Sequence, residues 1–128
     1  MPPRVTFATS INGGPAALAG DLTVPTFHVR PGQRLVMSVA ATVPGHAKVT
    51  TLWLGICRDR NDTNSHGYLD MNPTLASAHQ PLLAGRHTFG FGWRLPKPRL
   101  AATVYLCAYW SGDAAAAATQ NIAALAPS

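Results

Sequence analysis

The stretch "RHTFGFGWR", residues 86–94, decides the fold class, because its side chains alternate between two kinds. One kind carries a ring, and its members are His87, Phe89, Phe91 and Trp93. The other kind is small or polar, and its members are Thr88, Gly90, Gly92 and Arg94. A period of two over this length predicts a β-strand that is buried on one face only. The glycines leave the other face bare, which suits the close approach of a ligand or backbone, or a twisted or bulged strand.

Runs of strand-forming residues extend outward from this stretch. They cover residues 4–11, 22–29, 34–41, 48–57 and 101–110. Turn-forming groups that contain glycine or proline separate them, at residues 13–15, 31–32, 44–45, 84–85 and 96–98. This spacing is typical of all-β proteins. We therefore expect one antiparallel β-sandwich of seven or eight strands, immunoglobulin-like or jelly-roll-like, across residues 1–128.

The Ala-rich segment 113–128 leaves two alternatives. Alanine is the best helix former and Asp113 could cap a helix, whereas "TQNIAAL" could add a last strand. A single Ala-rich helix of this length is only marginally stable in water. We therefore expect a strand or an extended arm at 113–128.

The composition favours a protein with partners. Charged residues make up 12% of the 128 residues, about half the usual share, which leaves few charges to solvate a surface. Glutamate is absent and the net charge is +5, so an anionic partner is permitted. The basic residues form no block, so we do not expect nucleic-acid binding.

Two features of the sequence bear on the cellular location of the protein. No apolar run reaches the roughly 20 residues of a membrane helix, so we expect no membrane insertion. The N-terminus also lacks the apolar run of about 7–15 residues that a secretory leader needs. A complete chain would therefore be virion-borne or intracellular, and a chain whose leader was removed would be extracellular.

The stretch "VYLCAYWSGD", residues 104–113, resembles the penultimate strand of an immunoglobulin variable domain, with Tyr105 and Cys107 in the matching positions. The family's core tryptophan has no counterpart after Cys57, so we expect a sandwich that is not an antibody-type domain. A disulfide between Cys57 and Cys107 is a candidate. It would close a loop of about 50 residues and stabilise the folded protein by roughly 4 kcal/mol. Free buried cysteines are also common.

A second resemblance is to small β-sandwich proteins of unassigned role from high-GC bacteria. It rests on "LWLGI" at 52–56 and on a "G-x-H-x-F-x-x-x-W-x-x-P" pattern at 85–96. The resemblance implies a fold and not a function.

The segment 57–73 is the only long, strongly hydrophilic insertion, and it contains candidate metal ligands. Its weak candidate ligands are Asp62, Asn64, His66 and Asp70, spaced like part of a calcium loop. The closing glutamate of such a loop is missing, and Pro73 stands in its place. The five histidines form no metal-binding pair. We therefore expect neither a metal nor another cofactor.

No nucleophile, base and acid occur in a recognisable catalytic arrangement, so we do not expect an enzyme. The prediction is a non-enzymatic structural or interaction protein that acts as a subunit of a larger assembly, for example a virion decoration or tail-associated protein. Protein partners or self-association are expected. The candidate ligand or partner contacts are Arg58, Arg60, Trp93, Arg94 and Trp110. The alternatives are a carbohydrate- or envelope-binding module and, second, a small metal-dependent enzyme.

Overall fold

A computed structural model of the chain describes residues 4–20, 23–30, 32–45, 48–58, 69–78, 80–95, 103–113 and 115–127. Within these residues there are nine strands and no helix. In chain order the strands are β1 (Thr6–Ile11), β2 (Ala17–Leu18), β3 (Thr26–Val29), β4 (Arg34–Val43), β5 (Lys48–Cys57), β6 (Thr74–Ala78), β7 (Gly85–Arg94), β8 (Val104–Asp113) and β9 (Ala115–Pro127). The described part of the chain accordingly has no helix that could cross a membrane.

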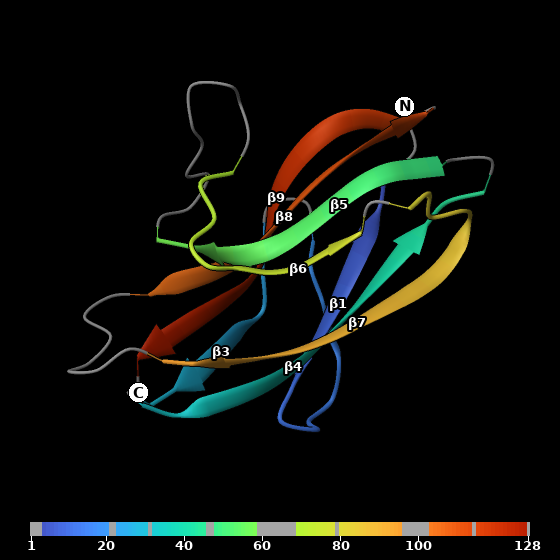
Figure 1. The fold of residues 1–128 in the computed structure, drawn as a ribbon. Coiled ribbons are helices and arrows are strands. Elements are labelled where there is room, and N and C mark those ends of the chain that lie inside the picture. The colour runs from blue at the N-terminus through green and yellow to red at the C-terminus, as the bar shows by residue number, and fades with distance from the viewer. Residues whose placement is uncertain are drawn as a thin grey trace.

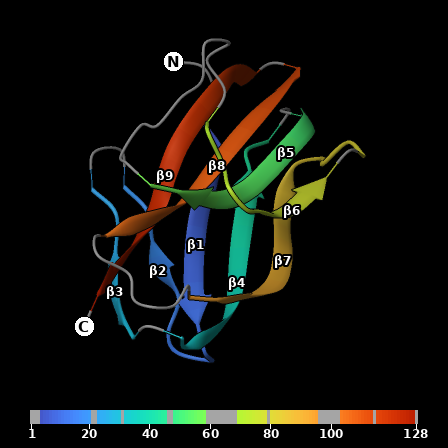
Figure 2. The same cartoon turned by 60° about the vertical axis from the view of Figure 1, so that its left-hand side comes forward.

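The strands form two layers that pack as a sandwich (Figure 1). The four-stranded sheet has the order β2-β1-β4-β7, and the five-stranded sheet has the order β3-β9-β8-β5-β6. Figure 2 shows the sheets face to face, with the edge strands β6 and β7 near each other.

The hydrophobic core lies between the two sheets. From β4 it receives Leu35, Met37 and Val39, and from β8 it receives Leu106, Ala108 and Trp110. The indole of Trp110 is 2% exposed. Its ring centre lies 5.4 Å from that of Phe7 in β1, so this contact joins the two sheets.

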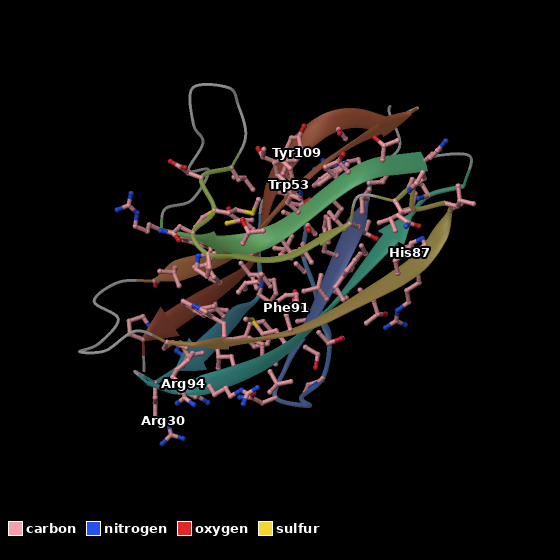
Figure 3. All side chains as sticks on the ribbon, viewed as in Figure 1. Arg30, Trp53, His87, Phe91, Arg94 and Tyr109 are labelled. Carbon is pink, nitrogen blue, oxygen red and sulfur yellow. The ribbon has the colours of Figure 1, made fainter. Side chains whose placement is uncertain are left out.

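The alternation predicted for residues 86–94 is confirmed in β7. The half-buried side chains are His87, Phe89, Phe91 and Trp93, and every residue between them is exposed. Phe91 points into the space between the sheets (Figure 3). The strand has no register shift against β4, so the glycines mark a bare outer face and not a bulge.

The all-β sandwich is confirmed, with two corrections. The described strands number nine and not seven or eight, because the short segments β2 and β6 also pair. One pairing is parallel, with Thr26 of β3 opposite Ala124 of β9. The chain changes sheets between β2 and β3, and β3 then runs in the same direction as β9.

The C-terminal segment forms a strand, as expected. β9 is paired with β8 and places Ile122 and Leu125 in the core, where each is fully buried. This burial explains why the segment is not a helix, because an isolated Ala-rich helix would leave its few large apolar side chains without a core.

Candidate functional site

β7 is an open edge of the four-stranded sheet. Among the described strands its only partner in that sheet is β4, which it follows through ten consecutive residue pairs without a shift. Natural edge strands are usually short, or they carry proline, lysine or a bulge that hinders pairing with another chain. β7 has ten residues and contains no proline or lysine. Another strand can therefore pair at this edge.

A hydrogen bond next to β7 shows which of its backbone groups lie on the edge. The Leu95 amide donates to the Gln33 carbonyl oxygen at 3.0 Å, so these residues bond across the β4–β7 pair. In an antiparallel pair, such residues alternate with residues whose amide and carbonyl groups point away from the partner. The N–H and C=O groups of Thr88, Gly90 and Gly92 therefore point to the open edge.

Two arginines face each other at one end of this edge, and we call them the arginine pair. Arg34 of β4 lies directly opposite Arg94 of β7. The alternation places them in the non-hydrogen-bonded type of pair, in which the Cα atoms are only about 4.5 Å apart. Like charges directly opposite each other destabilise a sheet. An anionic group between the two guanidinium groups would remove this repulsion.

The arginine pair lines a hollow of about 300 Å³, together with Gly92 and Trp93. The Arg34 guanidinium lies over Gly92, with its Nη2 atom 3.6 Å from the position that a Cβ atom would take. Arg94 Nη1 donates to the Gly32 carbonyl oxygen at 3.1 Å, which holds this side chain at the end of the sheet.

The positive charge at this end has no acidic counterpart among the described side chains. Arg30 and Arg94 point away from the sandwich at the same end (Figure 3). The one acidic side chain that the structure describes is Asp70, which shares a different hollow with Arg58. The end of the four-stranded sheet is therefore complementary to an anionic partner.

The outer face beside the edge has room for a large side chain. A Cβ atom built on Gly90 meets nothing within 4 Å. Across the strand pair, Gly90 lies opposite Ser38 and Gly92 lies opposite Val36, which is 57% exposed. An aromatic side chain on an added strand could lie over these glycines, as aromatic residues do in other sheets.

The two cysteines lie on the outer face of the five-stranded sheet, and both are fully buried. Cys57 is opposite Tyr105, and Cys107 is opposite Gly55, so the cysteines are diagonal neighbours. The Cβ atoms of a disulfide are about 3.5–4.5 Å apart, which is shorter than a diagonal separation. The two sulfur atoms are not bonded to each other, so the candidate disulfide is not formed.

The same sheet carries an aromatic pair. Trp53 of β5 lies opposite Tyr109 of β8, and their ring centres are 5.4 Å apart (Figure 3). Tyr109 is 8% exposed, and Trp53 covers it from the solvent side as a half-buried side chain.

The predicted partner contacts are not brought together. Arg94 is exposed in β7 of the four-stranded sheet, whereas Arg58 is exposed directly after β5 of the five-stranded sheet. Trp93 is half-buried and packs against the core, and it also lines the hollow of the arginine pair. The prediction of Trp110 as a contact was wrong, because its side chain is in the core. Arg60 lies outside the described residues.

Three of the four weak metal candidates, Asp62, Asn64 and His66, also lie outside the described residues. Asp70 is exposed. Across the described ranges, no group of three histidine, cysteine or acidic side chains is placed to hold a metal ion. Methionine sulfur is a further possible donor to soft metal ions.

Sequence reasoning missed Arg34, because the sequence alone does not show which strands are neighbours. In the structure, β4 and β7 are both ten residues long and pair antiparallel over their full length, which brings Arg34 to Arg94. Met71 and Asn121, which surround the cysteines, were missed for a similar reason, because they come from segments far apart in the chain.

Comparisons with known proteins identify no family for this chain. No family model matches the chain, and no curated protein matches it either.

Proposed function

We propose that the chain is a non-enzymatic interaction module and a subunit of a larger assembly, which binds an extended acidic segment of a partner protein along the edge of β7. The observation that supports this proposal best is the ten-residue strand β7, which among the described strands pairs only with β4 and ends in the arginine pair. Main-chain hydrogen bonds would supply affinity, and alternate side chains of the added strand would supply specificity. A virion setting remains a prediction from the sequence.

The strand order supports an immunoglobulin-like arrangement as a further part of the proposal. In that fold, one sheet has the order A-B-E-D and the other contains C, F and G. Here β1-β4-β7 corresponds to A-B-E, and β5-β8-β9 corresponds to C-F-G. No described strand occupies the D position beside β7. The partner segment would take this position.

Charge favours an acidic partner over a second copy of the chain. Two copies of β7 paired antiparallel over residues 86–94 would place Arg86 opposite Arg94 twice. Such like-charge pairs are destabilising. An added strand with acidic residues at both ends would instead place one carboxylate beside Arg86 and another beside the arginine pair.

Two synthetic peptides test the proposal. The first has nine residues of alternating threonine and valine, with glutamate at both ends and tyrosine in the centre, and the second has lysine in place of glutamate. We expect the acidic peptide to bind, and Arg94→Ala to weaken it about tenfold, with a further loss at high salt. Fluorescence anisotropy measures the affinities, and amide shifts of Thr88, Gly90 and Gly92 locate the site.

A substitution in the edge provides the decisive control. Gly90→Pro removes the N–H group that points to the edge and leaves the β4 hydrogen bonds in place. Gly90→Ala keeps that group, and its Cβ atom meets open space. We expect the first variant to lose peptide binding and the second to retain it. Equal affinity for the two peptides, or a Gly90→Pro variant that binds normally, would contradict the proposal, and concentration-dependent dimers would replace it with self-association.

A carbohydrate-binding module is the second candidate, and the Trp53–Tyr109 pair is the observation that favours it. Partly exposed aromatic rings can stack on sugars, but Tyr109 contributes little exposed surface here. We expect polysaccharides to leave the tryptophan fluorescence of the wild-type chain unchanged. A saturable fluorescence change that Trp53→Ala abolishes would favour this second candidate.

A further inference from the structure

A group of sulfur atoms lies on the outer face of the five-stranded sheet, and we call it the sulfur pocket. It contains Cys57, Cys107 and Met71, packed together with Leu69 and Tyr105. Both cysteines are fully buried, although they are on the outside of the sheet, because the segment after residue 68 covers them. The sulfur pocket is separate from the edge of β7, which belongs to the other sheet.

The covering segment is fixed in a position that brings the thioether to the thiols. The Ile56 amide donates to the Pro73 carbonyl oxygen at 2.9 Å, and the Asn72 amide donates to the Ile56 carbonyl oxygen at 2.8 Å. Met71 Sδ lies over Gly55, only 2.9 Å from the position that a Cβ atom would take there. Gly55 is the direct cross-strand partner of Cys107. The glycine thus provides the space in which the thioether lies beside Cys107.

A buried amide without a full set of partners lies next to one thiol. Asn121 is 5% exposed, and its Nδ2 atom has no hydrogen-bond partner among the described residues. Its Oδ1 atom is 3.5 Å from Cys107 Sγ, which also lies 3.3 Å from the Tyr105 carbonyl oxygen. A thiol has one hydrogen and cannot donate fully to both oxygens.

A thiolate at Cys107 would satisfy this amide. A half-turn of the Asn121 amide would direct an N–H group at the sulfur, and a thiolate is a hydrogen-bond acceptor. An isolated thiolate in an apolar pocket is costly, so a cation has to accompany it. The side chains of Cys57 and Met71 in the sulfur pocket also carry sulfur, and sulfur ligands favour a soft cation.

We propose that the sulfur pocket binds one Cu(I) ion through the thiolates of Cys57 and Cys107, with Met71 as a third, weaker ligand. Zinc in structural sites almost always takes four ligands, and the described part of the pocket supplies three sulfur atoms. Thiolate and thioether ligands favour Cu(I). In the binding step, two S–H bonds are replaced by two S–Cu bonds and two protons are released to solvent. The bound group then carries one net negative charge, which an N–H group of Asn121 beside Cys107 would stabilise. No group is oxidised or reduced.

The diagonal register suits a shared ion better than a disulfide. Sulfur atoms joined directly are about 2.05 Å apart, whereas two sulfur atoms on opposite sides of one metal ion are separated by about twice a metal–sulfur bond of roughly 2.3 Å. Cysteines that are diagonal neighbours, two residues from direct opposition, would therefore hold an ion between them without movement of the strands.

The test is an anaerobic titration of the reduced protein with Cu(I), in competition with a coloured Cu(I) chelator. We expect one ion per chain, and we expect Cys57→Ser and Cys107→Ser each to weaken binding by more than about a hundredfold. Met71→Leu and Asn121→Leu should weaken it by roughly tenfold, since they remove a weak ligand and a hydrogen-bond donor to a ligand. The matched control is Met37→Leu, because Met37 is buried in the core away from the pocket and should leave Cu(I) affinity unchanged.

A second measurement does not depend on folded variants. Bound Cu(I) should raise the melting temperature of the wild-type chain, whereas Zn(II) at the same concentration should do so much less. Wild-type protein that takes up no Cu(I), or Cu(I) that leaves the melting temperature unchanged, would overturn the proposal. A mass loss of two hydrogens in air, without retained copper, would instead show that the pair is a redox-active dithiol.

Discussion

Replacing Trp110 by alanine is expected to lower the free energy of unfolding by about 3–5 kcal/mol, as other large aromatic truncations in cores do. The indole is 2% exposed and packs against Phe7 of the opposite sheet, so its loss leaves a cavity at the contact between the layers. Domains of this size are stable by only about 5–15 kcal/mol. The variant should therefore unfold at much lower urea concentration than the wild-type chain, as measured by far-UV circular dichroism.

Trp53→Ala is the matched control, because it removes the same side chain from the neighbouring strand of the same sheet. Trp53 lies on the outer face and is only half-buried, with its ring against Tyr109. We expect this variant to lose about 1–2 kcal/mol, mostly from the aromatic contact. Equal losses in the two variants would show that Trp110 does not join the sheets. If Trp110→Ala fails to fold, Trp110→Phe should give a smaller, measurable loss in the same direction.

The sequence allows the fold class to be predicted because of one physical regularity. In a strand, successive side chains point to opposite faces, and a sheet that is buried on one face must alternate. β7 obeys this rule over residues 86–94, so its inward and outward residues there can be assigned from the order of the residue types alone.

β8 shows why the same rule fails elsewhere. Both of its faces are apolar, so the period of two does not indicate which face meets the core. In the structure Leu106 and Trp110 point inward, while Tyr105 and Cys107 point outward and are covered by a separate segment. Packing between distant parts of the chain determines which face of β8 meets the core.

The candidate sites depend on register, which a single sequence does not contain. The arginine pair exists because β4 and β7 are aligned with Arg34 opposite Arg94. Register also explains why the disulfide is not formed. The pairing of β5 with β8 places Cys57 opposite Tyr105, two residues away from Cys107. The residue types alone indicate a basic protein with two cysteines. The pairing of the strands determines which arginines and which sulfur atoms lie close together.

Gly112→Ala is expected to destabilise the protein by about 3 kcal/mol, at the upper end of the usual cost of overpacking. Gly112 lies where register shifts occur on both sides of β8, against β5 and against β9. A Cβ atom at this position would overlap the Lys48 carbonyl oxygen and lie 2.7 Å from Val49 Cα. These are backbone atoms, so no side-chain rotation relieves the overlap, and the β5–β8 pairing has to open locally.

Gly90→Ala separates this steric effect from the general effect of glycine on the unfolded chain. Both substitutions restrict the unfolded chain equally, which by itself stabilises a protein by about 0.4–1 kcal/mol. At Gly90 a Cβ atom meets nothing within 4 Å, so the free energy of unfolding should stay the same or rise slightly. Urea denaturation of the two variants, side by side, measures the difference. Similar stabilities would mean that β5 and β8 are not in close contact at Gly112, and the two register shifts there would have to be abandoned.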